Sequence, residues 1–261
     1  MFYTRLILGY FMQYLKTRLE YRGDFLVQLV TDLLFQGVNL VFILVVFSHT
    51  TDLQGWTREE VIFIYGYFLV PFAVFAAFFN LWDFNERYII RGEMDRVLTR
   101  PAHSLLQVIL ETMAPESLIG AVTGLAVMGW AAMRMDVDWS WYDPLLFLVF
   151  VIGGAAVYGG IYITLTSISL FSDSKTDIQP IMYNVGNYGR YPINIYSKVI
   201  QFVLTWVLPF AFVGFYPASF LLDDDRWSIL AMVTPLVGVV YMGIGITVWN
   251  WGIRNYRGAG N

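Results

Sequence analysis

Cysteine is absent from this 261-residue chain, and charged residues make up only 14% of it. Without cysteine the chain can form no disulfide, no thiolate metal site and no cysteine nucleophile. A soluble domain carries about 25% charged residues, so this chain has too few polar side chains to cover a globule. With 57% hydrophobic residues and a mean hydropathy of +0.58, its composition predicts a membrane protein.

Several chemistries lack the residues that they need. The two histidines, His49 and His103, fall on opposite sides of the membrane in the topology predicted below, so they form no joint metal site. No glycine-rich phosphate loop with Lys-Ser/Thr occurs, which argues against ATP hydrolysis by the chain alone. The net charge of −4, without a clustered basic patch, argues against nucleic acid as a partner. We therefore expect no catalytic residue, no metal and no directly bound cofactor.

Six apolar runs are long enough to cross a bilayer, since a span needs about 20 mostly apolar residues. The third contains Glu111 and Pro115, which predicts a kink or an interfacial start. The fifth ends at Gly214 and Pro217, which predict a helix break followed by a short external re-entrant element over 214–226. The expected spans are 25–48, 60–81, 105–133, 143–171, 198–216 and 228–250.

The basic residues predict the orientation of these spans. Six spans put both termini on one side, and 13 of the 16 lysines and arginines fall on that side. Basic loops stay in the cytoplasm, so both termini and the loops 82–104 and 172–197 are predicted to be cytoplasmic. The fold class is then all-α and polytopic, with residues 1–261 as one transmembrane domain in the cytoplasmic (inner) membrane.

Residues 1–24 are predicted to form an amphipathic helix in the membrane interface. Tyr3, Ile7, Tyr10 and Tyr14 share one face at helical spacing, and charged residues lie roughly opposite. The alternative is that this segment simply extends the first span.

Three acids fall inside the predicted spans. Burying a carboxylate in a membrane is costly, so each is a functional candidate. Asp32 could bind a cationic substrate, face a water-filled cavity or pair with a basic residue of another helix. Glu111 and Glu116 lie near the predicted start of the third span, where the helix dipole favours an acid, and a structural role is the preferred interpretation.

The motif GGAAVYGG, residues 153–160, carries small residues four positions apart. Such spacing lets two transmembrane helices approach closely. The motif therefore predicts tight helix packing, which is compatible with transport and with other membrane roles.

The polar segment Arg91–Ser104 separates two long apolar runs. Residues 83–100 carry four acids and four arginines, a mixture that suits protein recognition better than binding to an anionic lipid surface. The stretch GEMDRVLT can form about two helical turns, with Met94 and Leu98 on one side and Pro101 as its stop. We expect a short helix that docks on a partner; the alternative is an ordinary solvated turn between spans.

Two segments carry a family resemblance. The motif GEMDRVLTRP, residues 92–101, resembles the cytoplasmic loop of the permease subunits of ABC type 2 exporters, whose coupling helix lies between their second and third spans. Residues 190–222 are similar to the Arg-Tyr-Pro segment, fifth span and Pro-x-x-x-Leu tail of one branch of these permeases. The N-terminal helix, the six spans and the re-entrant stretch also fit, so the resemblance covers essentially the whole chain.

The resemblance implies a membrane-spanning subunit of an ATP-driven exporter, found in the inner membrane of a bacterium. Such a subunit is no enzyme itself; it pairs with a second permease, identical or homologous, and with two copies of an ATPase subunit that binds ATP and Mg²⁺. Asp32 is the candidate for the substrate path. The ATPase contact is expected at Gly92, Glu93, Asp95, Arg96, Leu98, Arg100 and Pro101.

Two other functions remain as alternatives. A proton- or ion-coupled secondary transporter could use Asp32, although such carriers usually show internal repeats and none is convincing here. A membrane-embedded enzyme could act on lipid phosphates with Mg²⁺ at Asp223–Asp225. That acidic run has no second acidic or histidine cluster, so a solvated external cap is its preferred interpretation.

Overall fold

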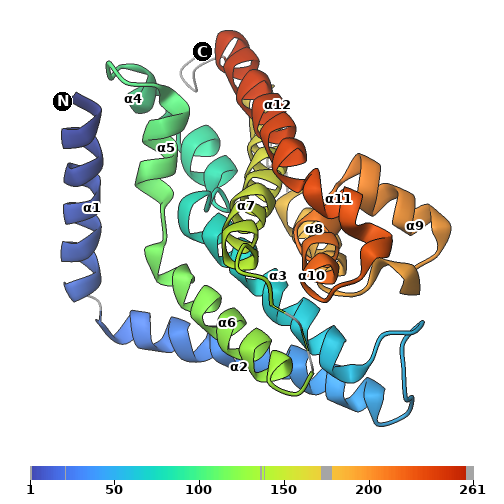
Figure 1. Cartoon of the computed structure of the whole chain (residues 1–261). Helices are drawn as coiled ribbons and strands as arrows, with labels where there is room; N and C mark the ends of the chain where they lie inside the picture. The colour runs from blue at the N-terminus through green and yellow to red at the C-terminus, as the bar shows by residue number, and fades with distance from the viewer. Residues whose placement is uncertain (1, 21, 136, 138, 172–177, 257–261) are drawn as a thin grey trace.

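The fold is that of a computed structural model, in which helices account for 81% of the structure. It contains no strand within the residues that it describes, in agreement with the all-α fold class. The described residues are 2–20, 22–135, 137, 139–171 and 178–256. Within them the α-helices are α1 (Phe2–Glu20), α2 (Arg22–Phe47), α3 (Arg58–Phe78), α4 (Glu93–Leu98), α5 (Ser104–Thr112), α6 (Ile119–Ala132), α7 (Asp143–Ile168), α8 (Ile178–Gly186), α9 (Lys198–Phe202), α10 (Phe215–Leu221), α11 (Ser228–Met232) and α12 (Thr234–Asn255) (Figure 1). The shorter π- and 3₁₀-helical segments are η1 (Asn85–Ile90), η2 (Pro115–Leu118), η3 (Ser169–Phe171), η4 (Asn187–Arg190), η5 (Ile193–Ile195), η6 (Val203–Val207), η7 (Phe210–Phe212) and η8 (Asp225–Trp227).

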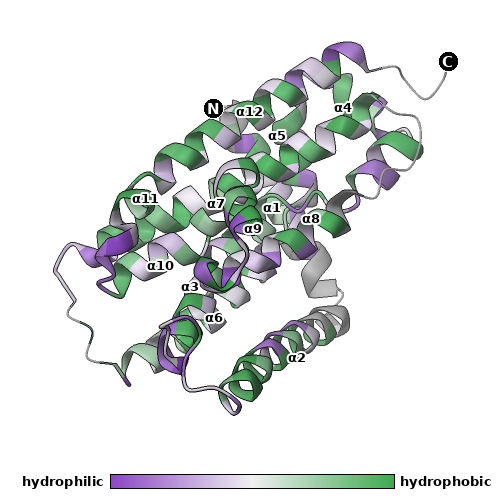
Figure 2. Ribbon diagram, turned by 90° about the vertical axis from the view of Figure 1, so that its right-hand side faces the viewer, coloured by the Kyte–Doolittle hydropathy of each residue, from purple (hydrophilic) through white to green (hydrophobic). Residues whose placement is uncertain are grey.

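Four helical stretches of the described chain are long and apolar enough to cross a membrane. The number rises to six if each of two sharply bent helix pairs is one span. Figure 2 shows hydrophobic residues along the middle of the helices and hydrophilic residues toward the ends of the bundle. The four stretches overlap the predicted first, second, fourth and sixth spans: Leu29–Phe47, Arg58–Phe78, Asp143–Phe171 and Asp225–Asn255.

The third predicted span is bent by 68° between α5 and the η2–α6 segment. Proline disfavours helical backbone in the residue before it, and Ala114 indeed leaves the helix with φ of −132° and ψ of 71°. The freed backbone is not left without partners, because the Ala114 N–H donates to the carbonyl oxygen of Ala77 on α3. The kink predicted from Pro115 is therefore confirmed.

The fifth predicted span is also broken, by 76° between Lys198–Val207 and the η7–α10 segment. The break lies at Leu208 and Pro209, so the prediction of a break at Gly214 and Pro217 is wrong. Pro217 sits in the first turn of α10, where a helix makes no use of the missing N–H. The ten residues before the break span about 15 Å, half of a hydrocarbon core of about 30 Å, so they cannot cross it alone.

A contact between two loops corrects the predicted topology. Asn194 accepts a hydrogen bond from Trp56 Nε1 at 3.0 Å and donates one to the carbonyl oxygen of Gln54 at 3.1 Å. The loop that holds Gln54 and Trp56 joins the first two spans on the predicted outer side. Residues in contact cannot lie on opposite faces of a bilayer, so placing all of 172–197 in the cytoplasm is wrong for the end that holds Asn194. Residues 172–177 lie outside the described residues.

Glycines bring α7 and α12 into close contact. A Cβ on Gly160 would lie 2.3 Å from the carbonyl carbon of Tyr241, and one on Gly245 would lie 2.7 Å from the oxygen of Gly160. About two turns before Gly245 on α12, a Cβ on Gly238 would lie 2.5 Å from the oxygen of Gly153. The tight packing predicted from the small-residue motif is confirmed, and its partner is α12.

The N-terminal pair of helices is packed differently from the rest. α1 and α2 run in different directions (Figure 1), so α1 is not a straight extension of the first span. α2 lies at the edge of the bundle (Figures 1 and 2), and Ile43 is the one buried side chain among those that the structure describes on it. A hydrogen bond of 3.0 Å from the Tyr65 hydroxyl to the Gln36 carbonyl oxygen helps to hold α2 against α3.

Candidate functional site

The hairpin between α3 and α5 carries the residues predicted to contact a partner. Gly92 has a φ of 74°, a left-handed backbone that glycine adopts without the strain of a side chain. This turn leads into α4, where Met94 and Val97 are buried. Leu98 is 39% exposed, so the prediction that Met94 and Leu98 share a side is wrong: Val97 takes the inner position. The predicted short helix is present, with a different inner face.

Gln107 fastens this hairpin from α5. Its side chain is fully buried, and Nε2 donates to the carbonyl oxygens of Val97 at 3.2 Å and Ala102 at 2.8 Å. The two acceptors lie on either side of Pro101, so the bonds close the turn across a residue that has no N–H of its own. Sequence reasoning missed Gln107, for which the signal was a single amide among the apolar residues that open the third span.

Glu111 of α5 connects four separate segments. Its carboxylate accepts hydrogen bonds from the hydroxyls of Tyr10 (3.0 Å) and Tyr88 (2.9 Å). It also accepts from Arg96 at 2.7 and 3.0 Å and from Arg100 at 3.1 Å. We call these five residues the Glu111 cluster. Through it α1, η1, α4 and the turn after α4 are held by one side chain that is only 6% exposed.

The contacts of Glu111 agree with a structural role, but its position corrects the reason predicted for that role. It lies in the last turn of α5, not at the start of a span, and an acid at a helix C-terminus faces the unfavourable end of the dipole. The guanidinium groups of Arg96 and Arg100 supply the compensating charge. In return, hydrogen bonding to the Glu111 carboxylate raises the pKa of the Arg96 guanidinium above its ordinary value. Glu111 is thus bound by ionic contacts rather than by a helix dipole.

The predicted ATPase-contact residues divide into two groups. Arg96 and Arg100 turn toward Glu111, and Glu93 accepts from Arg87 at 3.0 Å and from Arg96 at 3.2 Å. The second group faces away from the bundle and is exposed: Asp95, Leu98 and Pro101. The first group therefore holds the hairpin to the protein, with Arg96 and Arg100 remaining part-exposed. The second group adds exposed surface that a partner can reach.

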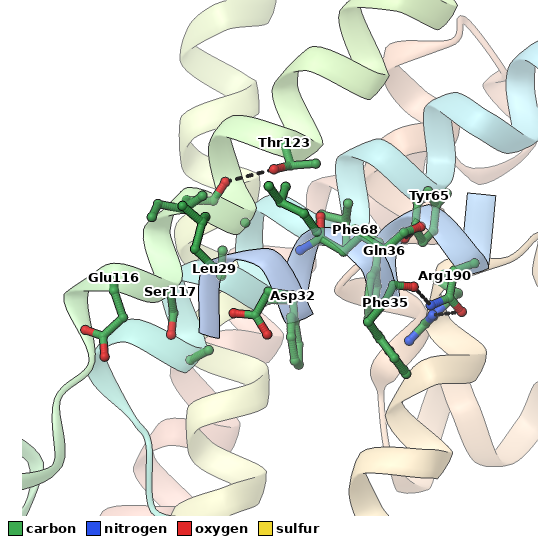
Figure 3. A pocket seen from close by; sticks show the side chains of 18 of the residues that line it. Leu29, Asp32, Phe35, Gln36, Tyr65, Phe68, Glu116, Ser117, Thr123 and Arg190 are labelled. Atoms are coloured by element: carbon green, nitrogen blue, oxygen red, sulfur yellow. Dashed lines mark hydrogen bonds between the residues drawn. The ribbon is translucent and has the colours of Figure 1, made fainter. Parts of the chain in front are cut away.

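A pocket of about 250 Å³ lies between α2, α3, η2, α6 and η4. Figure 3 shows Asp32, Glu116 and Ser117 toward one end of it and Arg190 toward the other. Tyr65 and Phe68 of α3 line it near Arg190. The pocket thus joins carboxylates, a guanidinium and aromatic walls inside the membrane-spanning part of the chain.

Asp32, the predicted substrate-path residue, lines this pocket. It lies on the same face of α2 as Gln36 and Asn39, four and seven positions later. Within the described residues Asp32 forms no ion pair, so the predicted alternative of a salt bridge to another helix of this chain finds no support. Its carboxylate faces the pocket.

α1 touches both the hairpin and the pocket. The Tyr10 hydroxyl reaches Glu111, and one turn later the Tyr14 hydroxyl donates to Glu116, which lines the pocket. The two acids lie at the two ends of the bend between α5 and α6. The N-terminal helix therefore links the hairpin to the pocket, a contact that its predicted amphipathic pattern alone did not indicate.

The acidic run Asp223–Asp225 forms a structural turn. Asp224 accepts from the backbone N–H of Arg226 at 3.1 Å and from its guanidinium at 2.8 Å, and so caps η8. The Arg226 guanidinium lies 5.8 Å from the centre of the Trp56 ring. These contacts bring the acidic run beside the loop between the first two spans.

A comparison with protein families matches residues 33–260 to the family described as ABC-2 family transporter protein. No curated protein and no solved structure matches the chain. The matched part includes the hairpin, both bent helix pairs and most of the pocket, and it covers far more than half of the chain. The chain therefore belongs to the ABC-2 transporter family, as a transmembrane permease.

Proposed function

We propose that the chain is the membrane-spanning subunit of an ATP-driven exporter and that α4 is its contact with the ATPase. The observation that carries this proposal is the two-sided structure of α4. Asp95 and Leu98 are exposed on its outer side and Met94 and Val97 are buried on its inner side, while Arg96, and Arg100 just after the helix, bind Glu111. A helix held in this way can be displaced by a partner on its outer side while it stays attached to the membrane spans.

The proposed complex contains two permeases, identical or homologous, and two ATPase subunits. ATP and Mg²⁺ are bound by the ATPase subunits, and this chain supplies no catalytic residue. Closure of the ATPase pair displaces α4, and the Glu111 cluster passes the displacement to α1, η1 and α5. The spans then shift between inward-open and outward-open or closed populations.

We further propose six crossings with both termini in the cytoplasm of a bacterial cell, in its inner membrane. The fifth crossing is formed by residues 178–195, because Asn194 reaches the loop between the first two spans. Residues 198–221 then enter from the outer side and turn back at Leu208 and Pro209. In this topology Arg190 is placed in the membrane and Lys198 on the outer side, and the remaining basic residues still favour a cytoplasmic location of the termini.

The substrate path is proposed to run beside α2, at the interface between the two permeases. α2 has one buried side chain among those described and exposes apolar residues along its length, so it has room for a partner helix. Asp32 faces the pocket on the inner side of α2. Neither the ion-coupled carrier nor the lipid-phosphate enzyme is favoured by a further observation, and Asp224 acts as a helix cap beside Arg226.

A charge reversal at Asp95 tests the ATPase contact. We expect Asp95→Lys to lower the amount of ATPase that co-purifies with the chain about five-fold or more, a loss of about 1 kcal/mol in contact free energy. The matched control is Asp83→Lys, which reverses an exposed acid of the same loop outside α4. Both variants should insert normally, as judged by yield and by a single peak in size-exclusion chromatography.

ATP hydrolysis in the purified complex gives the second measurement. Where ATPase remains bound to the Asp95→Lys chain, substrate should no longer stimulate its hydrolysis. Wild-type recovery of ATPase together with wild-type stimulation in the Asp95→Lys complex would contradict the proposed role of α4.

A further inference from the structure

Arg190 is a cation without an anion. Its side chain is 6% exposed, and within the described residues it forms no ion pair. Its donors reach two neutral amide oxygens, that of Asn39 at 2.7 Å and that of Asn187, while its Nε has no acceptor. A buried charge normally has a charged partner or a full set of hydrogen bonds, and Arg190 has neither.

The depth of Arg190 in the membrane raises the energetic cost of its missing counter-charge. Its partner Asn39 lies near the middle of the apolar stretch Leu29–Phe47. A guanidinium at that depth is expensive unless it meets a counter-charge or water, and such residues commonly mark a substrate path. Asp32 does not fill the role, because it lies seven residues before Asn39, about 10 Å away along α2.

The surroundings of Arg190 have the form of a binding site. The guanidinium carbon lies 5.5 Å from the centre of the Phe68 ring and 6.0 Å from that of Tyr65, and all three residues line the pocket (Figure 3). A guanidinium is suited to phosphate and carboxylate, since its donors match two oxygens of the same group. Arg190 therefore supplies the polar part of a site for an anionic group.

An apolar groove continues from this pocket. It has a volume of about 340 Å³ and is lined by α2, α3 and α6, among others by Leu40, Leu44 and Trp130. Thr123 lines both the groove and the pocket, so the two are adjacent. A ligand whose charged group meets Arg190 can place an apolar chain in the groove without leaving the protein.

We propose that Arg190 binds the anionic group of an amphiphile, a phosphate or carboxylate on an apolar chain, which lies in the groove between α2 and α6. This inference rests on the proposed exporter function, in which the bound amphiphile is the transported substrate. The anion completes the hydrogen bonding of Arg190 and neutralises its charge at mid-depth. The loosely packed edge helix α2 forms one wall of the site, so the ligand can enter sideways from the bilayer.

Binding is tested on the purified full-length chain in a neutral maltoside detergent, without ATPase. The probes are three fluorescent C12 amphiphiles that differ in their head group: phosphate, hydroxyl and trimethylammonium. Fluorescence anisotropy should show the phosphate probe bound at least about ten-fold more tightly than the other two, the factor that a hydrogen bond to a charged group supplies. Equal affinity of the wild-type chain for all three probes would overturn the proposal without any variant.

Variants of the site then assign the contact. Arg190→Gln keeps an amide that can still meet Asn39 but removes the charge, and it should lower the affinity for the phosphate probe at least about ten-fold. Arg190→Lys keeps the positive charge and should retain part of the affinity for the phosphate probe. The matched control is Arg91→Gln, which removes an arginine charge on the exposed hairpin, outside the pocket, and should leave phosphate affinity unchanged. An equal loss in Arg190→Gln and Arg91→Gln would show that the loss does not arise at Arg190 and would overturn the assignment.

Competition separates the two sources of such an anion. Displacement of the phosphate probe by phosphatidylglycerol, and not by phosphatidylcholine, identifies a membrane lipid as the occupant; no displacement by either identifies a free amphiphile. Because these measurements need no ATPase, they can fail while the Asp95 test succeeds. Loss of the Arg190 site and loss of the exporter function are therefore distinguishable.

Discussion

At the scale of single residues, the molecule depends on two buried charges that its helices do not by themselves stabilise. Glu111 lies at the unfavourable end of α5 and is compensated by Arg96 and Arg100. Arg190 lies at mid-depth and is met within the described residues by neutral amides and aromatic rings. The charge of Glu111 is paired within the chain and holds several segments together. The charge of Arg190 is the one that we propose a ligand pairs.

Neutralising Glu111 should loosen this joint. Glu111→Gln keeps the size of the side chain but removes the counter-ion of Arg100 and leaves Arg96 with Glu93 alone, and we expect a loss of about 1.5–3 kcal/mol in unfolding free energy. Both guanidinium groups remain part-exposed, so solvent limits the loss. The matched control, Glu86→Gln, removes an exposed pair with Arg91 and should cost less than about 1 kcal/mol.

Thermal unfolding in detergent measures both variants. An equal change in the two midpoints would show that Glu111 is no more important than a surface acid. If the cluster also transmits motion, Glu111→Gln should bind the ATPase normally while transport is reduced.

At the scale of the elements, two helix pairs are packed too closely for any side chain at the crossing. Gly160 and Gly245 bring α7 against α12, and Gly66 and Gly124 do the same for α3 and α6, with backbone atoms 2.6 Å from a built Cβ. Lipid chains are as apolar as leucine, so helices in a membrane associate through such close contact rather than through hydrophobic burial. These pairs form the rigid part of the molecule, in contrast to α2.

An added methyl group at the crossing should force α7 and α12 apart. The Cβ of Gly160→Ala would lie 2.3 Å from the backbone of Tyr241, which cannot move aside like a side chain, and we expect a cost of about 1–3 kcal/mol. Gly243→Ala is the control on α12, because its Cβ would meet nothing within 4 Å. A lower thermal midpoint for the first variant and an unchanged or higher one for the second would agree with the packing; equal midpoints would contradict it.

The sequence predicted elements well where one physical signal dominated. The polar hairpin stood out between apolar runs, and Pro115 marked the bend of the third span. Glu111 was misjudged because its partner Tyr10 is 101 residues away and is uncharged, so no local pattern links them. Gln107 was missed for the same reason: its acceptors are backbone oxygens, which every residue has.

At the scale of the whole molecule, the proposed topology differs from the one predicted by hydropathy in the segment that crosses the membrane fifth. Residues 198–216 are the more apolar, and hydropathy alone selects them. Residues 178–195 contain asparagines, glycines and Arg190, a composition that a span tolerates only when the protein covers it. Arg190 is indeed buried against α2 and α3, and Asn194 reaches the loop between the first two spans. Burial by other helices depends on tertiary packing, so it cannot be predicted from the local sequence.

Cysteine labelling distinguishes the two topologies directly, because the chain has no cysteine of its own. Ser197→Cys, at an exposed position before α9, should react with an impermeant thiol reagent from the same side as Thr51→Cys in the first loop. Thr99→Cys, exposed in the hairpin, should react from the opposite side. Labelling of Ser197→Cys together with Thr99→Cys would restore the original placement of the fifth span.

The sparse contacts of α2 also make the bilayer a component of the binding site. Its apolar stretch of 19 residues is about 28 Å long, slightly shorter than a hydrocarbon core of about 30 Å. In a thicker membrane α2 is too short to tilt and stands upright. In a thinner membrane it tilts. Since α2 is one wall of the pocket and the glycine-packed pair of α3 and α6 forms another, tilt changes the width of the pocket. Affinity for the phosphate probe should then vary with lipid chain length in nanodiscs, although no residue of the protein has changed.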